Sequence, residues 1–498
     1  MTNHETGRMN DDEKIRRSGS PGAVLKSKSN PRRPAKMLFS GRDARQFFRS
    51  MPSTHLLLRA GPIRLKFADG ELRYLCVGDR EIVRRVSFVV RDHHWDTAMP
   101  EFAKLSVEKR EDSFAIELEA KCRMPTVDYA WRARITGSAD GVIRFDAAGE
   151  PMSDFQSNRI GICVLYGAES LAGRQFEVRD AVGKTIAGEF TPLVSPVLLA
   201  ENYRELSYAF EDGLRVTARV EGALFSMEDQ RNYADSSYKA YAPLPYAYPA
   251  APVGVSLREV VSLAVEGAVS KEPQPEDANV TTIRLGGLAE GSKIPKVVRS
   301  VEGTPEVEFY AVNTQRGVHE GVEVLQFACN PALHLPDDDT FMENVGAVIH
   351  QVRTARSFAP GARIRIDPIT FNSKHPRPGL DPRNETAFGA AWSAVAMKHL
   401  ALAGVDEAGF AVHGKAARAV QAEIGVFAGR QIFETVPQAP VRPAVEALAV
   451  AAPDAIRIWL INTTDAPQRA VVVGGDGSEV IFACELAPHE ILARDLRL

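Results

Sequence analysis

The chain has 498 residues, of which 45% are hydrophobic and 25% are charged, as in ordinary globular proteins. This length exceeds what a single hydrophobic core supports, so it predicts two to four domains. The net charge of −4 and the isoelectric point near 6.3 argue against a nucleic-acid-binding protein. The sequence has neither a run of about 18 apolar residues nor an apolar amino-terminal segment. It therefore predicts no membrane span and no secretory signal, and the cytoplasm is the expected compartment.

The cysteines and histidines give no support for a metal or cofactor site. The five cysteines are scattered, odd in number and without Cys-x-x-Cys spacing, which favours a reducing compartment over a disulfide framework. The adjacent His93 and His94 would point to opposite faces of a strand. We interpret them as surface side chains that flank a buried Trp95.

The first half of the chain is dominated by strand-like patterns. Residues 1–36 are polar, with nine cations against four carboxylates, which predicts a disordered basic tail. Between residues 37 and 269, short apolar–polar alternations such as Ile63–Phe67 and Arg85–Val90 recur. Many short strands with few helical windows predict a large N-terminal β-sandwich.

The second half alternates strands and helices. Residues 270–303 are predicted to be a linker that contains one strand, Thr281–Leu285, and then a loop. Residues 304–440 have the pattern of a parallel α/β sheet or barrel, and residues 441–498 that of a small C-terminal β domain. The expected elements are strands at 308–313, 322–330, 363–367 and 408–413, a helix opened by a Thr340–Glu343 capping box, and an apolar helix at 387–402.

The segment Phe225–Tyr241 concentrates charges and aromatic rings. Such a block is costly to bury unless its charges pair, so it is either a solvated loop or a paired polar site. Its rings also provide stacking faces beside hydrogen-bonding groups, as a sugar-sized ligand requires. The candidates for substrate binding in this segment are Glu228, Asp229, Arg231, Asn232 and Lys239.

The same segment resembles the signature of a known family. Met227–Asn232, followed by Asp235, Ser237, Lys239 and Tyr241, is similar to the signature segment of the D-apionate lactonase family. Its members hydrolyse a branched-pentose aldonolactone to the acid. They consist of an N-terminal β domain, a TIM-type barrel and a small C-terminal β domain. The resemblance covers most of residues 85–269 and 307–415, and it further rests on Arg91-Asp92 with Trp95, Asn158–Leu165, Asn330-Pro331 with His334, and Asp381–Arg383 with Phe388–Trp392.

Two departures from the family pattern affect the expected fold and site. A TIM barrel takes about 250 residues and eight βα units, but only about four strand units can be placed here. By resemblance they match the second half of the barrel, and the first half is missing near Arg299–Gly303. The expected fold is therefore a multidomain α+β protein with a partial TIM-type barrel. The open barrel edge would be covered by a homodimer or by the sandwich, or the activity has been lost. In addition, His413 stands where the family pattern has a glutamate.

Lactone hydrolysis needs a base to activate water, donors for the oxyanion and an acid for the leaving hydroxyl. In α/β barrels these groups follow the strands, which gives the candidates Asn313, Asn330, His334, Asp367, Asn372 and His413. His334 is the expected base or acid, because histidine titrates near neutral pH, and Asp367 would orient it. Each candidate also has a structural interpretation: Asn330 could satisfy local backbone, and Asp367 could be a solvated strand end. Asp337–Asp339 could bind a metal with His334, but three aspartates before a helix more simply complement its dipole.

The sequence thus predicts a lactonase acting on a sugar-derived aldonolactone, without a cofactor, with the substrate between the strand ends and the 225–241 segment. One alternative is a catalytically degenerate carbohydrate-binding paralogue. Another is a glycoside hydrolase, which needs two carboxylates about 5–10 Å apart, whereas only Asp367 is well placed.

Overall fold

The computed structural model describes residues 56–243, 250–267, 280–300, 306–333, 335–372, 381–438 and 443–497. The predicted tail and His334 lie outside these ranges. Within the described ranges, none of the helices combines the length and hydrophobicity that crossing a membrane requires.

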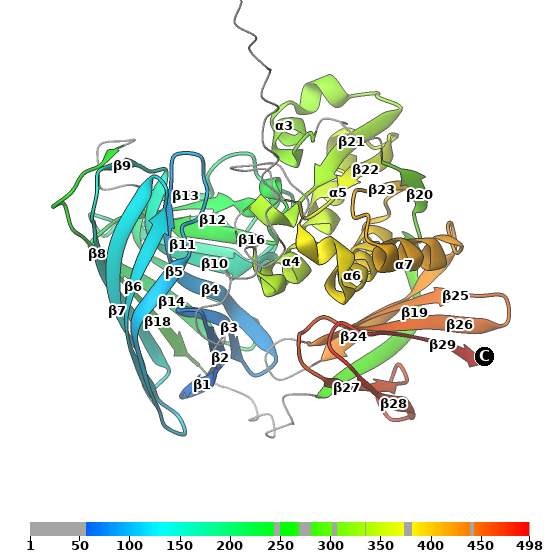
Figure 1. Cartoon of the computed structure of the whole chain (residues 1–498), viewed down its shortest axis with the longest axis horizontal. Helices are drawn as coiled ribbons and strands as arrows, with labels where there is room; N and C mark the ends of the chain where they lie inside the picture. Colours follow the sequence, from blue (N-terminus) through cyan, green and yellow to red (C-terminus); the bar gives the residue numbers. More distant parts are fainter. Residues whose placement is uncertain are drawn as a thin grey trace, which may run out of the picture. The chain divides into compact units, whose positions relative to one another are not determined.

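The N-terminal part is a β domain built almost entirely from antiparallel strands (Figure 1). Its elements are β1 (Leu56–Ala60), β2 (Ile63–Ala68), β3 (Glu71–Val77), β4 (Arg80–Arg91), β5 (Pro100–Lys109), β6 (Phe114–Met124), β7 (Val127–Gly137), β8 (Val142–Pro151), β9 (Phe155–Gln156), β10 (Arg159–Gly167), α2 (Ala168–Leu171), β11 (Gln175–Asp180), β12 (Thr185–Glu189), β13 (Ala200–Ala209), β14 (Arg215–Glu221), β15 (Phe225–Asp229), the 3-10 turn η1 (Gln230–Tyr233), β16 (Ser237–Tyr241), β17 (Ala250–Ala251) and β18 (Leu257–Glu266).

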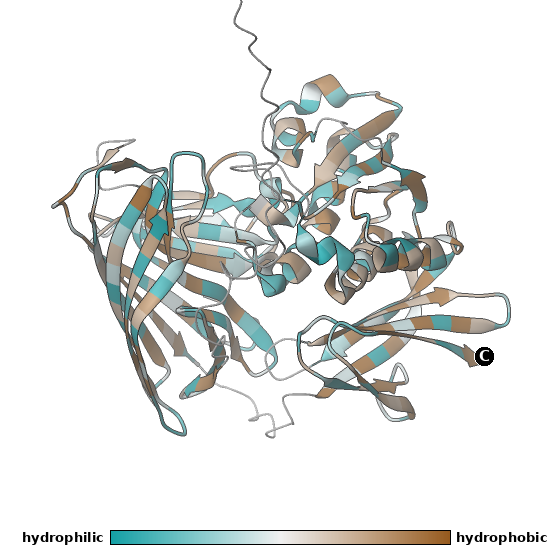
Figure 2. Cartoon of the chain, viewed as in Figure 1, coloured by the Kyte–Doolittle hydropathy of each residue, from teal (hydrophilic) through white to brown (hydrophobic). Residues whose placement is uncertain are grey.

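Sixteen of these strands form one sheet whose path runs β1-β2-β3-β4-β10-β16-β15-β13-β14-β18-β8-β7-β6-β5, with β11 and β12 attached to β13. The hydropathy of successive residues alternates along β6 and β7, as Figure 2 shows, and the inward residues are buried. Leu65 of β2 and Ile116 of β6 belong to the same buried cluster. The sheet therefore folds over, and its two ends share one hydrophobic core.

A four-stranded parallel sheet with helices follows. Its elements are β20 (Lys296–Arg299), α3 (Phe309–Thr314), η2 (Arg316–His319), β21 (Val324–Cys329), η3 (Pro331–Leu333), α4 (Asp338–Asn344), α5 (Ala347–Phe358), β22 (Arg363–Ile369), η4 (Pro382–Glu385), α6 (Ala387–Ala403), β23 (Glu407–Phe410) and α7 (Lys415–Gly425). The strand order is β20-β23-β22-β21. The first strand therefore lies beside the last, as it does where a (β/α)₈ barrel closes, but the described sheet has four strands rather than eight.

The face of this sheet opposite its helices is polar. Ile364 and Ile366 of β22 are buried in the core beneath the helices. The alternate residue Arg365 pairs with Glu407 of β23. At this position the face therefore carries an ion pair and not an apolar side chain.

Three local predictions in this region need correction. Where a strand was expected at 308–313, Phe309–Thr314 form helix α3. Phe309 and Val312, three positions apart, are both buried, and the Phe309 ring lies 4.9 Å from that of Phe327. Helix α4 is capped by Asp337, whose side chain accepts the Thr340 N–H at 2.9 Å, and not by a Thr340–Glu343 box. A separate helix, α5, then begins at Ala347.

The C-terminal sheet contains β28-β27-β19-β24-β25-β26-β29 in that order. These strands are β19 (Val280–Lys293), β24 (Gln431–Gln438), β25 (Val445–Ala451), β26 (Ala455–Asn462), β27 (Gln468–Val473), β28 (Val480–Leu486) and β29 (Ile491–Arg497). The loop expected after Leu285 is therefore wrong, because β19 continues to Lys293. Two of the strands, β19 and β24, precede residue 441 and still join this sheet.

Candidate functional site

Asp367 lies on β22 where three parallel strands approach each other. Its side chain is 5% exposed, and its Oδ1 accepts the hydroxyl of Ser300, just after β20, at 2.7 Å. Gly409 of the intervening β23 makes room for it, because a Cβ there would lie 2.5 Å from the Asp367 carboxyl carbon. The sequence analysis placed Asp367 at a solvated strand end or in a site. The structure encloses it across the sheet, and the glycine and serine around it were missed because they come from distant segments.

A network of amide side chains follows the ends of β21 and β22. Asn330 Nδ2 donates to the Asn372 carbonyl at 3.1 Å, and Asn330 Oδ1 accepts the Ala332 N–H at 3.0 Å. Asn372 Oδ1 accepts from Asn384 Nδ2 at 2.8 Å. Asn384, which sequence reasoning did not single out, is 3% exposed, and its Oδ1 receives no hydrogen bond from the described residues. This buried acceptor is the unsatisfied group of the network.

Arg383 joins this network to the start of α4. Its guanidinium donates twice to Asp381 and, at 2.6 Å, to Asp338. It also lies over the ring of Phe341, 4.3 Å from its centre. Burial raises the pKa of Asp338, and the nearby Arg383 charge opposes that shift. The strand ends are therefore surrounded by fixed dipoles and charges that could orient a polar substrate.

Of the two histidine candidates, only His413 lies among the described residues. His413 follows β23, and its side chain is exposed. The Asn372 amide, after β22, donates to the carbonyl of Ala411, after β23, at 3.5 Å. This contact links the ends of β22 and β23. His334 lies outside the described residues.

The centre of the 225–241 segment is buried, so the solvated-loop interpretation is wrong for it. The Asp229 and Arg231 side chains are both 0% exposed and pair at 2.6 Å. The Arg231 guanidinium also donates to the carbonyl of Thr191 at 2.7 Å, and it lies 4.6 Å from the centre of the Tyr238 ring. Arg231 is therefore held by the protein itself, as a buried charge must be.

This segment packs against helix α5 rather than against the strand ends. Gln351 of α5 donates to the Arg231 carbonyl at 2.7 Å, and His350 Nδ1 lies 3.1 Å from the Arg231 guanidinium. Burial, followed by the Arg231 charge, lowers the pKa of His350 to about 4. Asn232 Oδ1 accepts from Asn313 of α3 at 2.9 Å. These contacts of Arg231 and Asn232 are thus made with α5 and α3.

Glu228 and Lys239 lie together on β15 and β16, at the edge of the same segment. Their charged groups are 3.0 Å apart, and the Glu228 side chain is 26% exposed. The Tyr241 hydroxyl donates to Glu228 at 3.3 Å. Burial lowers the pKa of Lys239, and Glu228 opposes this effect. These residues form the part of the candidate binding set that is nearest to solvent.

The three aspartates at the start of α4 form ion pairs with cationic side chains. Asp337 pairs with Arg73 of β3 at 2.8 Å, and Asp339 pairs with Lys66 of β2 at 2.6 Å. Burial alone would raise the pKa of Asp337, but the Arg73 charge and hydrogen bonds hold it well below its usual range. The described residues contain no group of three ligand-type side chains suited to a metal ion.

The two adjacent histidines occupy a turn rather than a strand. The His93 and His94 ring centres lie 3.7 Å apart, so the side chains do not point to opposite faces. Trp95 has φ 72° and is 48% exposed, so the prediction that it is buried is wrong. Its ring lies 5.8 Å from the Arg159 guanidinium.

These features define a β-rich multidomain protein that joins a large antiparallel β domain to a parallel α/β sheet with polar side chains at its strand ends. Residues 46–269 match the family model "D-apionate lactonase, N-terminal domain", and residues 301–455 match "D-apionate lactonase, TIM barrel domain". The chain belongs to the D-apionate lactonase family.

A D-apionate lactonase of Brucella anthropi is 26% identical to this chain over 376 residues, which cover 68% of this chain and 60% of that protein. The chain thus spans about 60% of the curated relative that it matches. Two solved structures are similar at low scores. An α-galactosidase from Geobacillus stearothermophilus has a TM-score of 0.31 and 8% identity, over 89% of this chain and 100% of that chain. A galactose mutarotase-like protein from Lactobacillus casei has a TM-score of 0.29 and 10% identity, over 43% and 100%.

Proposed function

We propose that this protein hydrolyses a sugar-derived aldonolactone of the D-apionolactone type to its acid, and that the reaction takes place at the carboxyl ends of β20–β23. The observation that supports this most is the placement of Asp367. A carboxylate enclosed between three parallel strands, bonded to one serine hydroxyl and close to Gly409, is unfavourable to bury.

In this proposal, Asp367 acts at the water that attacks the lactone carbonyl, as a base or through a histidine. Asn330, Asn372 and Asn384 surround the ring oxygens and hydroxyls, and the unsatisfied Asn384 Oδ1 accepts from a substrate hydroxyl. His413 and His334 are the two candidates for donating a proton to the leaving hydroxyl. The Asp229–Arg231 pair positions the β domain on α5, and Glu228 with Lys239 is the remaining candidate for contact with a substrate hydroxyl.

A proton-release assay on purified protein tests this proposal, with D-apionolactone and other aldonolactones as substrates. The Asp367→Asn variant is expected to lower kcat by about 10²–10⁴-fold, and His413→Ala and His334→Ala identify the acid. Glu323→Gln is the matched control, because Glu323 is 87% exposed beside the amino end of β21. Equal turnover by Asp367→Asn and wild type would refute the role of Asp367.

A sugar-acid-binding protein without turnover is the second candidate. It is favoured by the described sheet, which has four strands where a (β/α)₈ barrel has eight. In that case aldonates would bind with the same dependence on Asn330 and Asn384, but no lactone would release protons.

A further inference from the structure

The turn between β4 and β5 presents a tryptophan to solvent. The four tryptophans of the chain all lie in the described ranges, and Trp95 is 48% exposed whereas the other three are at most 4% exposed. Tryptophan is highly buried on average. The turn is well anchored, because Asp92 Oδ1 accepts the N–H groups of His94 and Asp96 at 2.8 and 3.0 Å. The exposed ring of Trp95 is therefore held in place by its backbone.

The guanidinium of Arg159, on β10, lies between two aromatic rings. It is 5.8 Å from the centre of the Trp95 ring and 3.3 Å from the centre of the Tyr241 ring. Arg159 is 8% exposed, and its Nη1 donates a long hydrogen bond to the Ala242 carbonyl at 3.4 Å. Its Nη2 makes no hydrogen bond to the described residues, and it is not among the atoms shut off from solvent. This nitrogen is therefore open to a ligand.

Arg159 also lacks a counter-charge. It forms no ion pair with any carboxylate in the part of the chain that the structure describes. Three other buried arginines, Arg73, Arg84 and Arg231, each have a carboxylate oxygen within 2.8 Å. A guanidinium taken out of water without a counter-charge is unfavourable. The partner that Arg159 lacks is therefore an anion.

The nearby carboxylates have partners of their own. Glu228 pairs with Lys239 at 3.0 Å. Burial lowers the pKa of Lys239, Glu228 opposes this shift, and the Arg159 charge adds to it. The carboxyl of Glu259 accepts the Ile162 N–H at 2.6 Å. The charge of Arg159 is thus left for one carboxylate of a ligand, whose two oxygens match the planar fork of a guanidinium.

The surrounding groups indicate what else the ligand carries. The Trp95 ring provides an apolar face for C–H groups. The partly exposed Glu228 accepts the Tyr241 hydroxyl at 3.3 Å and has further capacity to accept from a ligand hydroxyl. A hydroxylated carbon chain that ends in a carboxylate satisfies all of these groups.

We propose that Trp95, Arg159 and Tyr241 form a binding site for a sugar acid of the aldonate type. The site belongs to the β domain and is separate from Asp367. The choice of an aldonate among sugar acids rests on the proposed function, of which an aldonate is the product.

Isothermal titration of the full chain with gluconate and D-apionate tests this proposal. Sorbitol has the hydroxylated chain of gluconate without the carboxylate, and acetate has the carboxylate without the chain. At least one of the two aldonates should bind about tenfold or more tightly than sorbitol and acetate. Equal binding of sorbitol would show that the charge is not recognised, and equal binding of acetate would show an adventitious ion only. Either result, or no binding of both aldonates, would overturn the proposal.

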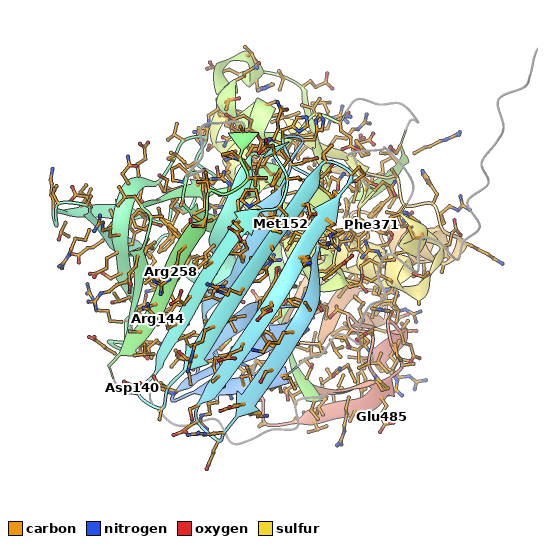
Figure 3. The ribbon with its side chains drawn as sticks, turned by 60° about the vertical axis from the view of Figure 1, so that its left-hand side comes forward. Asp140, Arg144, Met152, Arg258, Phe371 and Glu485 are labelled. Carbon is orange, nitrogen blue, oxygen red and sulfur yellow. The ribbon has the colours of Figure 1, made fainter. Side chains whose placement is uncertain are left out.

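Two variants and a control locate the binding. Arg159→Met should weaken it by about tenfold or more, because charged hydrogen bonds are lost. Trp95→Ala should weaken it by about twofold to tenfold, and it decides the question if Arg159→Met does not fold, because Trp95 is exposed. The control is Arg258→Met, which should bind like the wild type. Arg258 is exposed and pairs with Asp146, as does the neighbouring Arg144 in Figure 3. Binding that survives both variants would refute the site.

Tryptophan fluorescence gives an independent measurement. Trp131, Trp392 and Trp459 are buried, so acrylamide should quench mainly Trp95. A bound aldonate should reduce the quenching of the wild type, and Trp95→Phe should lose this protection. Unchanged quenching at a saturating aldonate concentration would place the ligand elsewhere and refute the site.

The two proposals fail independently. Aldonate binding should be unchanged in Asp367→Asn. Binding that depends on Arg159, without turnover of any lactone, would refute the proposed function alone. Lactone turnover without aldonate binding at Trp95 would refute the second site alone.

Discussion

The carboxyl group of Glu259 should control how the stability of the β domain varies with pH. Glu259 lies on β18, is 0% exposed, and receives one hydrogen bond, from the Ile162 N–H to Oε2 at 2.6 Å. Its Oε1 has no hydrogen-bond partner among the described residues. Gly161, at φ 130°, leaves the space for this carboxyl, because a Cβ there would lie 2.7 Å from Oε2. Burial raises the pKa of Glu259 from an ordinary 4.5 to about 7, and the Ile162 hydrogen bond and the Arg159 charge oppose this.

The sign and size of the effect follow from this difference in pKa. Below about pH 4.5 the carboxyl is protonated in both the folded and the unfolded chain, so its stabilising contribution is complete. As the pH rises, the unfolded chain ionises first, and the contribution is lost by the time the pH passes the folded pKa of about 7. Each pKa unit corresponds to 1.36 kcal/mol, so the difference between 4.5 and 7 amounts to about 3 kcal/mol.

The Glu259→Gln variant removes this titration and keeps the shape of the side chain. Melting temperatures of the variant and wild type, measured between about pH 5 and about pH 8, should diverge as the pH rises. At about pH 8 the variant should melt roughly 6–12 °C higher, since 1 kcal/mol shifts a domain of this size by about 2–4 °C. Glu119→Gln, an exposed change on β6, is the control and should follow the wild type. If the Glu259→Gln and wild-type curves ran parallel, the buried carboxyl would not be the cause.

Three further predictions concern the pairs and edges around the α/β sheet. Arg231→Met leaves Asp229 buried without its partner, so the free energy of unfolding, measured thermally without ligand, should fall by about 3–5 kcal/mol. An unchanged melting temperature together with a raised KM would instead show that Arg231 contacts the substrate. Gly409→Ala should displace the Asp367 carboxyl and lower kcat more than it changes KM, and Gly361→Ala, where a Cβ meets nothing within 4 Å, is its control. The outer edges of β20 and β21 each lack a neighbouring strand in the described sheet, so light scattering should give the mass of a homodimer; a monomer at micromolar concentration would contradict this expectation.

Local patterns were sufficient to predict much of the β domain. Ile63–Phe67 was expected as a strand and forms most of β2, and Arg85–Val90 lies within β4. Alternation identifies β2 because one of its faces is buried in a core. β4 is buried on both faces, and its alternate polar residues Arg85 and Ser87 are buried as well. The apolar helix expected at 387–402 corresponds to α6 (Ala387–Ala403). Its sequence is apolar on nearly all sides because the helix is buried on nearly all sides.

The features that were missed depend on partners far away in the sequence. The charges of the 225–241 segment suggested either a loop or a paired site, and only the packing of α5 decides between them, since Gln351 and His350 enclose Arg231. The same holds for Asp367, whose environment comes from Ser300 and Gly409. Residue types at these positions are visible in the sequence, but their juxtaposition is not.

The position of β19 in the C-terminal sheet has a consequence for synthesis of the chain. β19 pairs in parallel with β27, and Ile283 faces Val472, 189 positions later. At a synthesis rate of about 5–20 residues per second, β19 leaves the ribosome roughly 10–40 s before this neighbour exists. During that interval β19 lacks its parallel neighbour, although β24, which pairs with its other edge, is completed before β27. A nascent chain stalled before Gln431 should therefore carry β19 as a binding site for chaperones, because neither neighbouring strand exists yet, and chaperone release should require completion of both β24 and β27.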